Sequence, residues 1–144
     1  MPVQENTALN TDASRFLYPG MLIAGEEPGT ITTILGSCIA VCLWDPTLRA
    51  GGMNHYLLPY WNGDGLQTPK YGNVAIPMLI EKMRLIGSRK GNLVAKVFGG
   101  GSVLESLNGP IDVGSRNIAL ADEMLASENI QVASSDLGGK SGRK

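Results

Sequence analysis

Hydrophobic residues in the first half of this chain occur in short runs that predict β-strands. Each run is rich in β-branched or other apolar residues and is bounded by turn-forming residues, which is typical of strands. The runs are residues 21–24, 30–35, 39–44 and 50–59. The next segment, 60–72, is so rich in Asn, Gly, Asp and Pro that it predicts a loop.

The second half of the chain predicts two helices, over residues 72–87 and 113–129, because apolar residues recur there at helical spacing. The predicted apolar faces are Val74, Ala75, Met78, Leu79, Met83 and Ile86 in the first helix and Ile118, Ala121, Met124 and Leu125 in the second. Proline is tolerated only near the first turn, so Pro77 predicts that the first helix begins late or kinks. Residues 92–98 and 130–135 predict two more strands, and the glycines between them predict a turn followed by one helical turn.

This order of elements predicts an α+β fold, in which layered β-sheets carry helices packed outside. The length of 144 residues fits one domain that buries about two thirds of the surface exposed by its unfolded chain. Residues 1–15 are polar and show no periodicity. We therefore expect a flexible lead-in over residues 1–15 and a single domain over residues 16–144.

Charge and composition exclude several classes of function. The net charge is −1, so a general attraction to nucleic acid or to an anionic membrane is not expected. The chain has no run of about 18 apolar residues, and its N-terminus lacks the basic start and apolar centre of a secretory signal. In a strand, Cys38 and Cys42 would lie about 13 Å apart at their α-carbons, whereas a disulfide needs less than about 7 Å. Free thiols predict a cytoplasmic protein, and the lack of a long apolar run predicts that it is not inserted in a membrane.

The candidate nucleophiles lie in the segment LGSCIAVC. Cys38 follows Gly36 and Ser37 at the edge between a tight turn and a strand, where a side chain can be accessible and backbone N–H groups can bind an oxyanion. Cys42 lies inside the apolar run and is expected in the core, since free cysteine is among the most buried residue types. Ser37 lacks the flanking glycines of the G-x-S-x-G elbow and is expected only to form the turn.

His55 is the only histidine in the chain, so any Cys–His mechanism within this protein must use it. The spacing of Cys38 and His55 permits a catalytic pair but does not show the distance between the two side chains. The structural alternative stays open: a lone histidine on a strand is more often a polar residue with a satisfied ring, and both cysteines can be core residues.

Metal and phosphate sites are not predicted. Cys38, Cys42 and His55 offer only three soft ligands without the usual C-x2-C spacing, so we expect no metal ion. The segment 134–141 lacks the first glycine of a phosphate loop, and Leu104 replaces the third glycine of G-x-G-x-x-G. We expect no cofactor, and we expect the glycines of FGGGS to provide close backbone packing beside a site.

The motifs LGSC, AVCLWDP and GGMNHYLLP, in this order, resemble the CheD family of chemoreceptor glutamine deamidases. The resemblance continues through KYGNVAIPMLI, KVFGGGSVLES, IDVGSRNI and SSDLGGKSGRK, and it covers about residues 16 to 144. It implies a protein-glutamine deamidase of bacterial and archaeal chemotaxis. It also implies a fold similar to that of a cysteine-hydrolase superfamily that includes deamidating toxins.

Matched residue by residue, the resemblance implies a catalytic triad. The family's nucleophile falls on Cys38, its histidine on His55, and its threonine, six residues before the cysteine, on Thr32. We expect His55 to draw the proton from Cys38 and to lower the pKa of the thiol as an imidazolium. Gly36 and Ser37 are expected to form the turn whose N–H groups support the oxyanion.

The resemblance also implies partners. The substrates would be the cytoplasmic domains of methyl-accepting chemoreceptors. The alternative function is a binding module that docks on a chemotaxis phosphatase of the CheC type and stimulates it. Members of the family usually continue past the GG…GR segment, so we expect a domain that is a short member or lacks a further C-terminal strand or hairpin.

Overall fold

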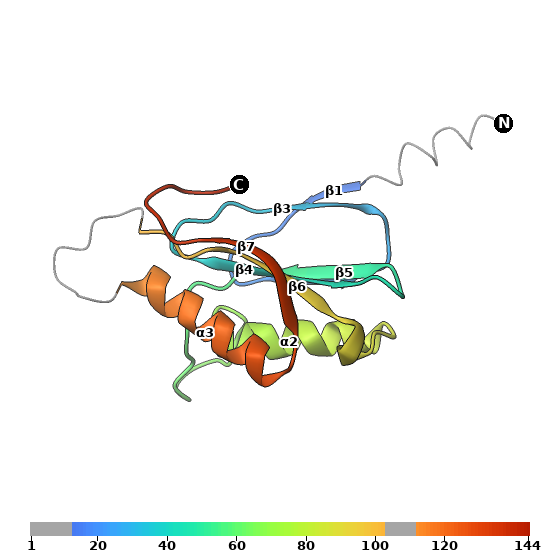
Figure 1. Ribbon diagram of the computed structural model, residues 1–144. Coiled ribbons are helices and arrows are strands. Elements are labelled where there is room, and N and C mark those ends of the chain that lie inside the picture. The colour runs from blue at the N-terminus through green and yellow to red at the C-terminus, as the bar shows by residue number, and fades with distance from the viewer. Residues whose placement is uncertain (1–12, 103–111) are drawn as a thin grey trace.

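A five-stranded sheet forms the middle layer of the molecule in the computed structural model, which describes residues 13–102 and 112–144 (Figure 1). In spatial order its strands are β2 (Leu22–Gly25), β5 (Ala50–Asn54), β4 (Ile39–Asp45), β6 (Val94–Gly99) and β7 (Gln131–Leu137). The first four strands are antiparallel to their neighbours, and β7 runs parallel to β6.

Two further layers cover the faces of this sheet (Figure 1). The helices α2 (Gly72–Leu85) and α3 (Val113–Ser127) pack on one face, and a short 3-10 helix, η1 (Lys90–Asn92), precedes β6. A small parallel sheet of β1 (Ala13–Phe16) and β3 (Gly29–Thr32) lies on the other face. The layered α+β prediction is therefore confirmed, with both helices on the same side of the sheet.

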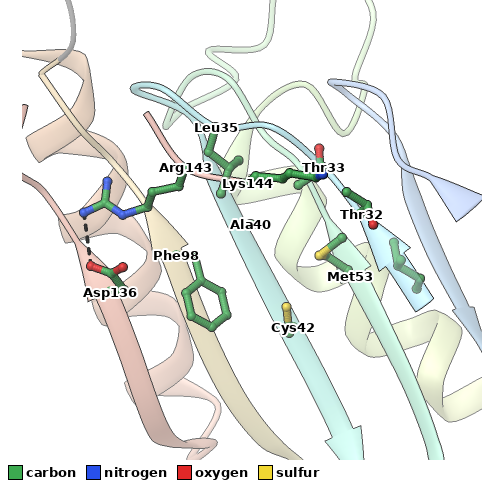
Figure 2. A pocket seen from close by; sticks show the side chains of 11 residues that line it. Thr32, Thr33, Leu35, Ala40, Cys42, Met53, Phe98, Asp136, Arg143 and Lys144 are labelled. Atoms are coloured by element: carbon green, nitrogen blue, oxygen red, sulfur yellow. Dashed lines mark hydrogen bonds and ion pairs between the residues drawn. The ribbon is translucent and has the colours of Figure 1, made fainter. Parts of the chain in front are cut away.

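The face of the large sheet opposite the helices carries a small apolar cluster and a cavity of about 620 Å³ (Figure 2). Ala40 and Met53 from the sheet pack there with Leu17 and Leu35. The cavity is lined by Ile31, Thr32, Thr33, Leu35, Ala40, Cys42, Met53, Phe98, Asp136, Arg143 and Lys144. This side of the sheet is therefore less completely filled than the helical side.

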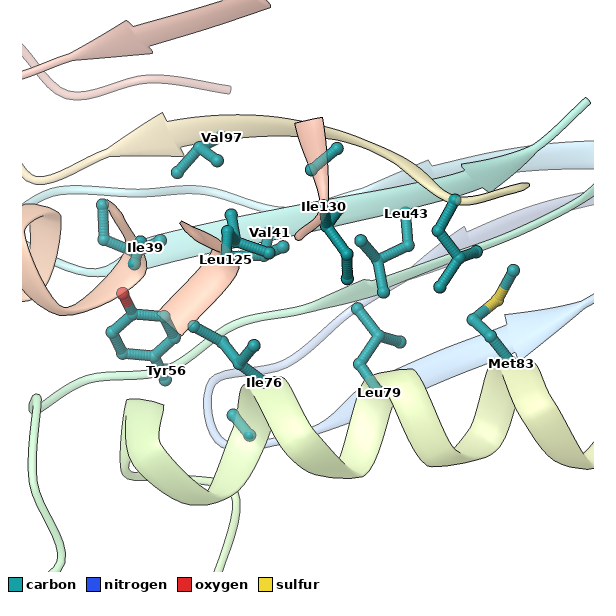
Figure 3. Close-up of a cluster of buried hydrophobic side chains, with 14 of the residues drawn as sticks. Ile39, Val41, Leu43, Tyr56, Ile76, Leu79, Met83, Val97, Leu125 and Ile130 are labelled. Carbon is teal, nitrogen blue, oxygen red and sulfur yellow. The ribbon is translucent and has the colours of Figure 1, made fainter. Parts of the chain in front are cut away.

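The main core lies between the sheet and the helices (Figure 3). Alternate residues of β4, namely Ile39, Val41 and Leu43, point toward the helices because successive side chains of a strand face opposite sides. Leu79 of α2 and Leu125 of α3 pack against them, each at most 1% exposed. Burying one such side chain contributes roughly 1.5–3 kcal/mol. Ala40 on the opposite face of β4 is also buried, so the first part of the strand is continuously apolar instead of alternating, whereas Trp44 near its end is 46% exposed.

Helix α2 differs from its prediction on its buried face. It begins at Gly72, as the predicted range of 72–87 has it, and Pro77 lies inside it, so the late start that Pro77 suggested does not occur. Ile76 is fully buried, whereas Met78, predicted for the apolar face, is 39% exposed. A Cβ on Gly72 would collide with Leu120 and with the Tyr56 ring, so the helix requires a glycine at this close approach. None of the helices in the described ranges is long and apolar enough to cross a bilayer.

Several predicted boundaries also shift. The strand predicted over 50–59 ends at Asn54, and the strand predicted over 30–35 ends at Thr32. Residues 13–15 of the expected lead-in belong to β1, so that expectation is wrong for them, while residues 1–12 lie outside the described residues. The helical turn expected after the glycine run falls within residues 103–111, which are also outside the described part of the chain.

Candidate active site

The turn that precedes β4 is fixed by its three carbonyl groups. The oxygens of Gly36, Ser37 and Cys38 accept hydrogen bonds from Gly101 N, Asn117 Nδ2 and Gly100 N at 2.9, 3.0 and 2.8 Å. The donors come from the glycine run after β6 and from the first half of α3, two segments far from the turn in sequence. All three carbonyls of the turn therefore point into the protein.

The N–H groups of the same turn point away from these anchors. The structure contains no cis peptide among the described residues, and in a trans peptide the N–H lies opposite the C=O. The N–H groups of Ser37 and Cys38 must therefore point to the side that their anchored carbonyls leave free. Within the described part of the chain, neither group donates a hydrogen bond to another residue, and the N–H of Cys38 contacts its own thiol. The turn thus offers two backbone donors next to the Cys38 side chain, which is what an oxyanion site requires.

The glycine run after β6 makes this anchoring possible. Gly99 and Gly100 adopt φ values of 111° and 69°, which residues with a Cβ rarely reach. A Cβ on Gly99 would collide with the Cys38 carbonyl, and a Cβ on Gly114 of α3 would collide with the carbonyls of Gly100 and Gly101. The predicted close backbone packing of these glycines is confirmed, and its place beside a functional site stays a prediction.

His55 is held in one tautomer by Thr33. The imidazole is 2% exposed, and its Nδ1 lies 2.7 Å from Thr33 Oγ1. The Thr33 hydroxyl donates its single hydrogen to the Leu17 carbonyl at 2.7 Å, so it must accept from the Nδ1–H of His55. The lone pair of the ring is then on Nε2. This atom is buried and has no hydrogen-bond partner among residues 13–102 and 112–144.

The register of the chain places Cys38 and His55 on one face of the sheet. Ile39 and Tyr56 form an antiparallel pair, with N–H···O distances of 3.1 and 2.9 Å, and both side chains enter the main core. Cys38 and His55 precede these two residues in the chain, so their side chains point to the opposite face of the sheet. Cys38 lies opposite Leu57 in this register, which makes His55 its diagonal neighbour. Such residues lie about 7–8 Å apart at their α-carbons, with closer Cβ atoms. No hydrogen bond joins the Cys38 thiol to His55 Nε2 in the described structure, so the pair is adjacent but not yet engaged.

The threonine on the imidazole is Thr33 and not Thr32. Thr32 ends β3, its carbonyl accepts a bond from Leu17 N at 2.8 Å, and its side chain lines the cavity of Figure 2. Neither Cys38 nor His55 lines that cavity. Thr32 and Thr33 are chemically identical neighbours, so a shift of one residue in the exit from β3 decides which of them reaches the ring.

Burial favours the neutral forms of both candidate catalytic groups. It raises the pKa of the Cys38 thiol, which a hydrogen bond from its own backbone N–H only partly offsets. Burial also lowers the pKa of His55. The expected thiolate–imidazolium pair with a lowered thiol pKa is therefore wrong for the resting structure, which favours a thiol beside a neutral imidazole.

Cys42 has a still less reactive environment. Burial raises the pKa of its thiol to about 11, opposed only weakly by the charge of Lys96. Its side chain packs with the smaller apolar cluster, as expected of a core residue, but it is partly exposed at the cavity. Thiolate character controls cysteine reactivity, so Cys42 is a poor nucleophile near neutral pH.

Sequence reasoning missed Asn117, which contacts both the turn before β4 and the segment after β5. Its side chain is fully buried, and Nδ2 donates to the carbonyls of Ser37 and Leu57, each at 3.0 Å. The hydroxyl of Tyr56 donates to the Asn117 carbonyl at 2.6 Å. The available signal was an asparagine at the same helical spacing as the buried Ala121 and Leu125, within an otherwise apolar stripe of α3.

The C-terminal segment supports the turn from the other side. Arg143 and Leu35 exchange backbone hydrogen bonds, both at 2.8 Å, immediately before Gly36. The Arg143 guanidinium donates to the Gly138 carbonyl at 2.6 Å and pairs with Asp136 at 3.2 Å. The last residues of the chain therefore form part of the scaffold that positions Cys38.

Comparison with known proteins identifies the family of this chain. The family model described as CheD chemotactic sensory transduction matches residues 57–144. A probable chemoreceptor glutamine deamidase CheD from Trichlorobacter lovleyi is 52% identical over 129 residues, covering 90% of this chain and 80% of the relative. Equally named proteins from Sulfurimonas denitrificans (47% identical, 90% and 84% covered) and, as CheD 1, Anaeromyxobacter dehalogenans (45%, 92% and 77%) are also similar. The chain belongs to the CheD family.

A solved structure gives a weaker likeness. The hypothetical protein YfiH of Bacillus licheniformis superposes with a TM-score of 0.44 and 16% sequence identity, covering 86% of this chain and 48% of that chain. Similarity at this level is too weak to define either the superfamily or the chemistry.

Proposed function

We propose that this chain is a protein-glutamine deamidase that converts glutamine side chains of chemoreceptors to glutamate and releases ammonia. The names of its CheD relatives point to this reaction. The observation that carries the proposal is the orientation of His55, whose Nδ1–H is held by Thr33 while its buried Nε2 lone pair lies on the face that carries Cys38. A base fixed in this tautomer beside a thiol suits attack on a carboxamide.

The first half of the reaction forms a thioester. His55 Nε2 takes the Cys38 proton while Sγ attacks the carboxamide carbon, and the amide oxygen becomes an oxyanion. The N–H groups of Ser37 and Cys38 hold this oxyanion; losing one such donor typically costs roughly 100- to 1000-fold in rate. The imidazolium then gives its proton to the nitrogen, the C–N bond breaks, and ammonia leaves.

The second half of the reaction hydrolyses the thioester. Neutral His55 takes a proton from a water molecule, whose oxygen attacks the thioester carbon. The C–S bond breaks, Sγ regains its proton from the imidazolium, and a glutamate side chain is released. Because burial disfavours both charged forms, proton transfer accompanies each attack and no ion pair is stored in the resting site.

The third role in this proposal falls on Thr33 in place of Thr32, giving Cys38, His55 and Thr33 as the working set. The α+β arrangement is compatible with a distant relationship to the cysteine hydrolases that include deamidating toxins. Each turnover adds one negative charge to a receptor helix and creates a site that can be methylated. Since such receptor segments are cytoplasmic, the protein would act in the cytoplasm.

The mass of the receptor tests the proposed reaction. Deamidation replaces an amide NH2 with OH and adds about 1 Da per glutamine. We expect wild type and Cys42→Ala to produce this gain on a chemoreceptor cytoplasmic domain and Cys38→Ala to produce none. An undiminished gain with Cys38→Ala would exclude the assignment of the nucleophile.

A binding function is the second candidate, and the observation that favours it is that no hydrogen bond joins the Cys38 thiol to His55 Nε2 among the described residues. In this alternative the protein docks on a phosphatase of the CheC type and stimulates it, and Cys38 is not used. Wild-type protein that leaves receptor mass unchanged but raises the rate of such a phosphatase would support this alternative.

A further inference from the structure

The side-chain amide of Asn117 has only one orientation compatible with its neighbours. Its two closest partners, the Ser37 and Leu57 oxygens, are both backbone carbonyls, which only accept hydrogen bonds. The nitrogen must therefore face them, and each of its two hydrogens is used. The side chain is fully buried with both donors engaged, while its Oδ1 has no hydrogen-bond partner among the described residues.

One of these two bonds acts on the peptide that carries the Cys38 N–H. The Ser37 carbonyl and the Cys38 N–H belong to the same trans peptide and point in opposite directions. Because the Asn117 amide holds the Ser37 carbonyl toward the protein interior, it also fixes the Cys38 N–H in the opposite, outward direction. The bond also withdraws electron density from the carbonyl oxygen, which makes the N–H at the other end of the peptide a stronger donor.

The other bond of the Asn117 amide joins the turn to the segment that carries His55. Leu57 lies opposite Cys38 in the strand pair defined by Ile39 and Tyr56. The same amide nitrogen thus holds the carbonyl before Cys38 and the carbonyl two residues after His55. This arrangement sets the separation between the nucleophile and the base as well as the direction of the oxyanion donor.

Helix α3 presents Asn117 from a rigid base. The carboxylate of Asp112 caps the helix by accepting from Ser115 N at 2.7 Å, and Gly114 packs against the carbonyls of Gly100 and Gly101. Tyr56 adds its hydroxyl bond to the Asn117 carbonyl. Asn117 lies about one helical turn after the start of α3, where the helix backbone is held by these other contacts. The backbone would therefore stay in place if the side-chain bonds to the Ser37 and Leu57 carbonyls were lost.

We infer that Asn117 is a positioning residue, which orients the Cys38 N–H toward the oxyanion of the deamidation transition state. The inference rests on the proposed function but assigns a role that neither the triad nor the relatives' names contain. A positioning role of this kind predicts different effects on two reactions of the Cys38 thiol. Deamidation passes through an oxyanion, whereas alkylation by iodoacetamide forms an S–C bond, breaks a C–I bond and develops no oxyanion.

The test compares these two reactions in Asn117→Ala and Asn117→Asp. The aspartate keeps the shape of the side chain but loses both amide donors near neutral pH. We expect kcat for receptor deamidation to fall roughly 10- to 100-fold, less than the loss of an oxyanion donor itself, with KM changed less than about twofold. The rate of Cys38 alkylation, measured in a Cys42→Ala background, should change less than about twofold. Ser88→Ala is the matched control: it removes a buried hydrogen bond to Asp45 at the other end of β4 and should leave both rates unchanged.

Three results would overturn the inference. They are an unchanged kcat in folded Asn117 variants, a parallel fall in kcat and alkylation, and a loss expressed only in KM. If the variants do not fold, amide hydrogen exchange in wild type decides, because the Asn117 side-chain NH2 must be strongly protected if both bonds exist. Rapid exchange of these hydrogens would refute the arrangement. Failure of the proposed function itself is distinguishable, since wild type would then release no ammonia in the same assay.

Discussion

Replacing Thr33 by valine tests which hydroxyl controls the base. Valine has nearly the shape of threonine but lacks the oxygen that accepts from His55 Nδ1 and donates to the Leu17 carbonyl. The variant therefore leaves packing almost unchanged while it leaves a buried N–H and a buried carbonyl without their partner. The hydrogen of the imidazole can then shift from Nδ1 to Nε2. A protonated Nε2 can no longer accept the proton of the Cys38 thiol.

The magnitude follows from the two lost hydrogen bonds. A net hydrogen bond contributes about 0.5–1.5 kcal/mol, and an unsatisfied buried partner costs about 1–3 kcal/mol. Two buried partners are left unsatisfied, so we expect the free energy of unfolding to fall by about 2–6 kcal/mol. The unsatisfied N–H of His55 alone, at about 1–3 kcal/mol, corresponds to a loss of roughly 5- to 150-fold in kcat through the change of tautomer.

The assay is ammonia release from a receptor cytoplasmic domain, together with thermal unfolding. Thr32→Val is the matched control, because it makes the same chemical change one residue away in a side chain that lines the cavity and not the imidazole. We expect Thr32→Val to keep kcat within about threefold. Strong loss with Thr32→Val and normal turnover with Thr33→Val would refute the reasoning and restore the threonine implied by the family resemblance.

Two further predictions concern pH and the glycine run. Burial lowers the pKa of His55, so the imidazole stays neutral to a pH below its usual pKa of 6.5, and the acid limb of kcat/KM should lie below pH 6.5. Stability should fall as the pH drops from 6.5 through the folded pKa, because the unfolded chain then binds a proton that the folded chain does not. A pH–rate profile and denaturant unfolding across pH 4–8 measure both effects, and an acid limb above pH 7 would contradict them. Gly99→Ala should lower both stability and turnover, because the added Cβ would displace the Cys38 carbonyl. Gly91→Ala is the control and should change neither, because the space around its Cβ is open. Thermal unfolding and ammonia release measure the two effects, and an active, stable Gly99→Ala would contradict the packing argument.

The elements of the fold were largely predictable because their signals are local. Residues 39–41 of the apolar run of β4 are buried on both faces, and the periodicity of α3 placed Ala121 and Leu125 correctly. The choice between Ile76 and Met78 was not available from the sequence, since both fit the apolar pattern of α2. That choice depends on how the helix is rotated on the sheet, which contacts such as the close approach of Gly72 to Tyr56 determine.

The site was predictable only in part, for a related reason. The chain has one histidine and one cysteine directly after a glycine turn, so composition limits the choices for base and nucleophile. Neither composition nor spacing distinguishes Thr32 from Thr33, because the distinction arises where β3 ends. Asn117 lies 79 positions beyond Cys38 in the chain, and only the packing of α3 against the turn shows that its amide reaches the Ser37 carbonyl.

The neutral resting pair has a consequence for how this site would choose its substrate. A stored thiolate would react with many electrophiles, whereas a buried thiol with a raised pKa needs a base and an oxyanion site at the same moment. Only a carboxamide that reaches both Nε2 of His55 and the N–H groups of the turn meets these conditions. Selectivity would then depend on the fixed geometry of the Gly36–Ser37–Cys38 carbonyls, each held from inside the protein, more than on the intrinsic reactivity of the sulfur. Variants that loosen this turn should therefore lose deamidation before they lose reactivity toward small alkylating agents.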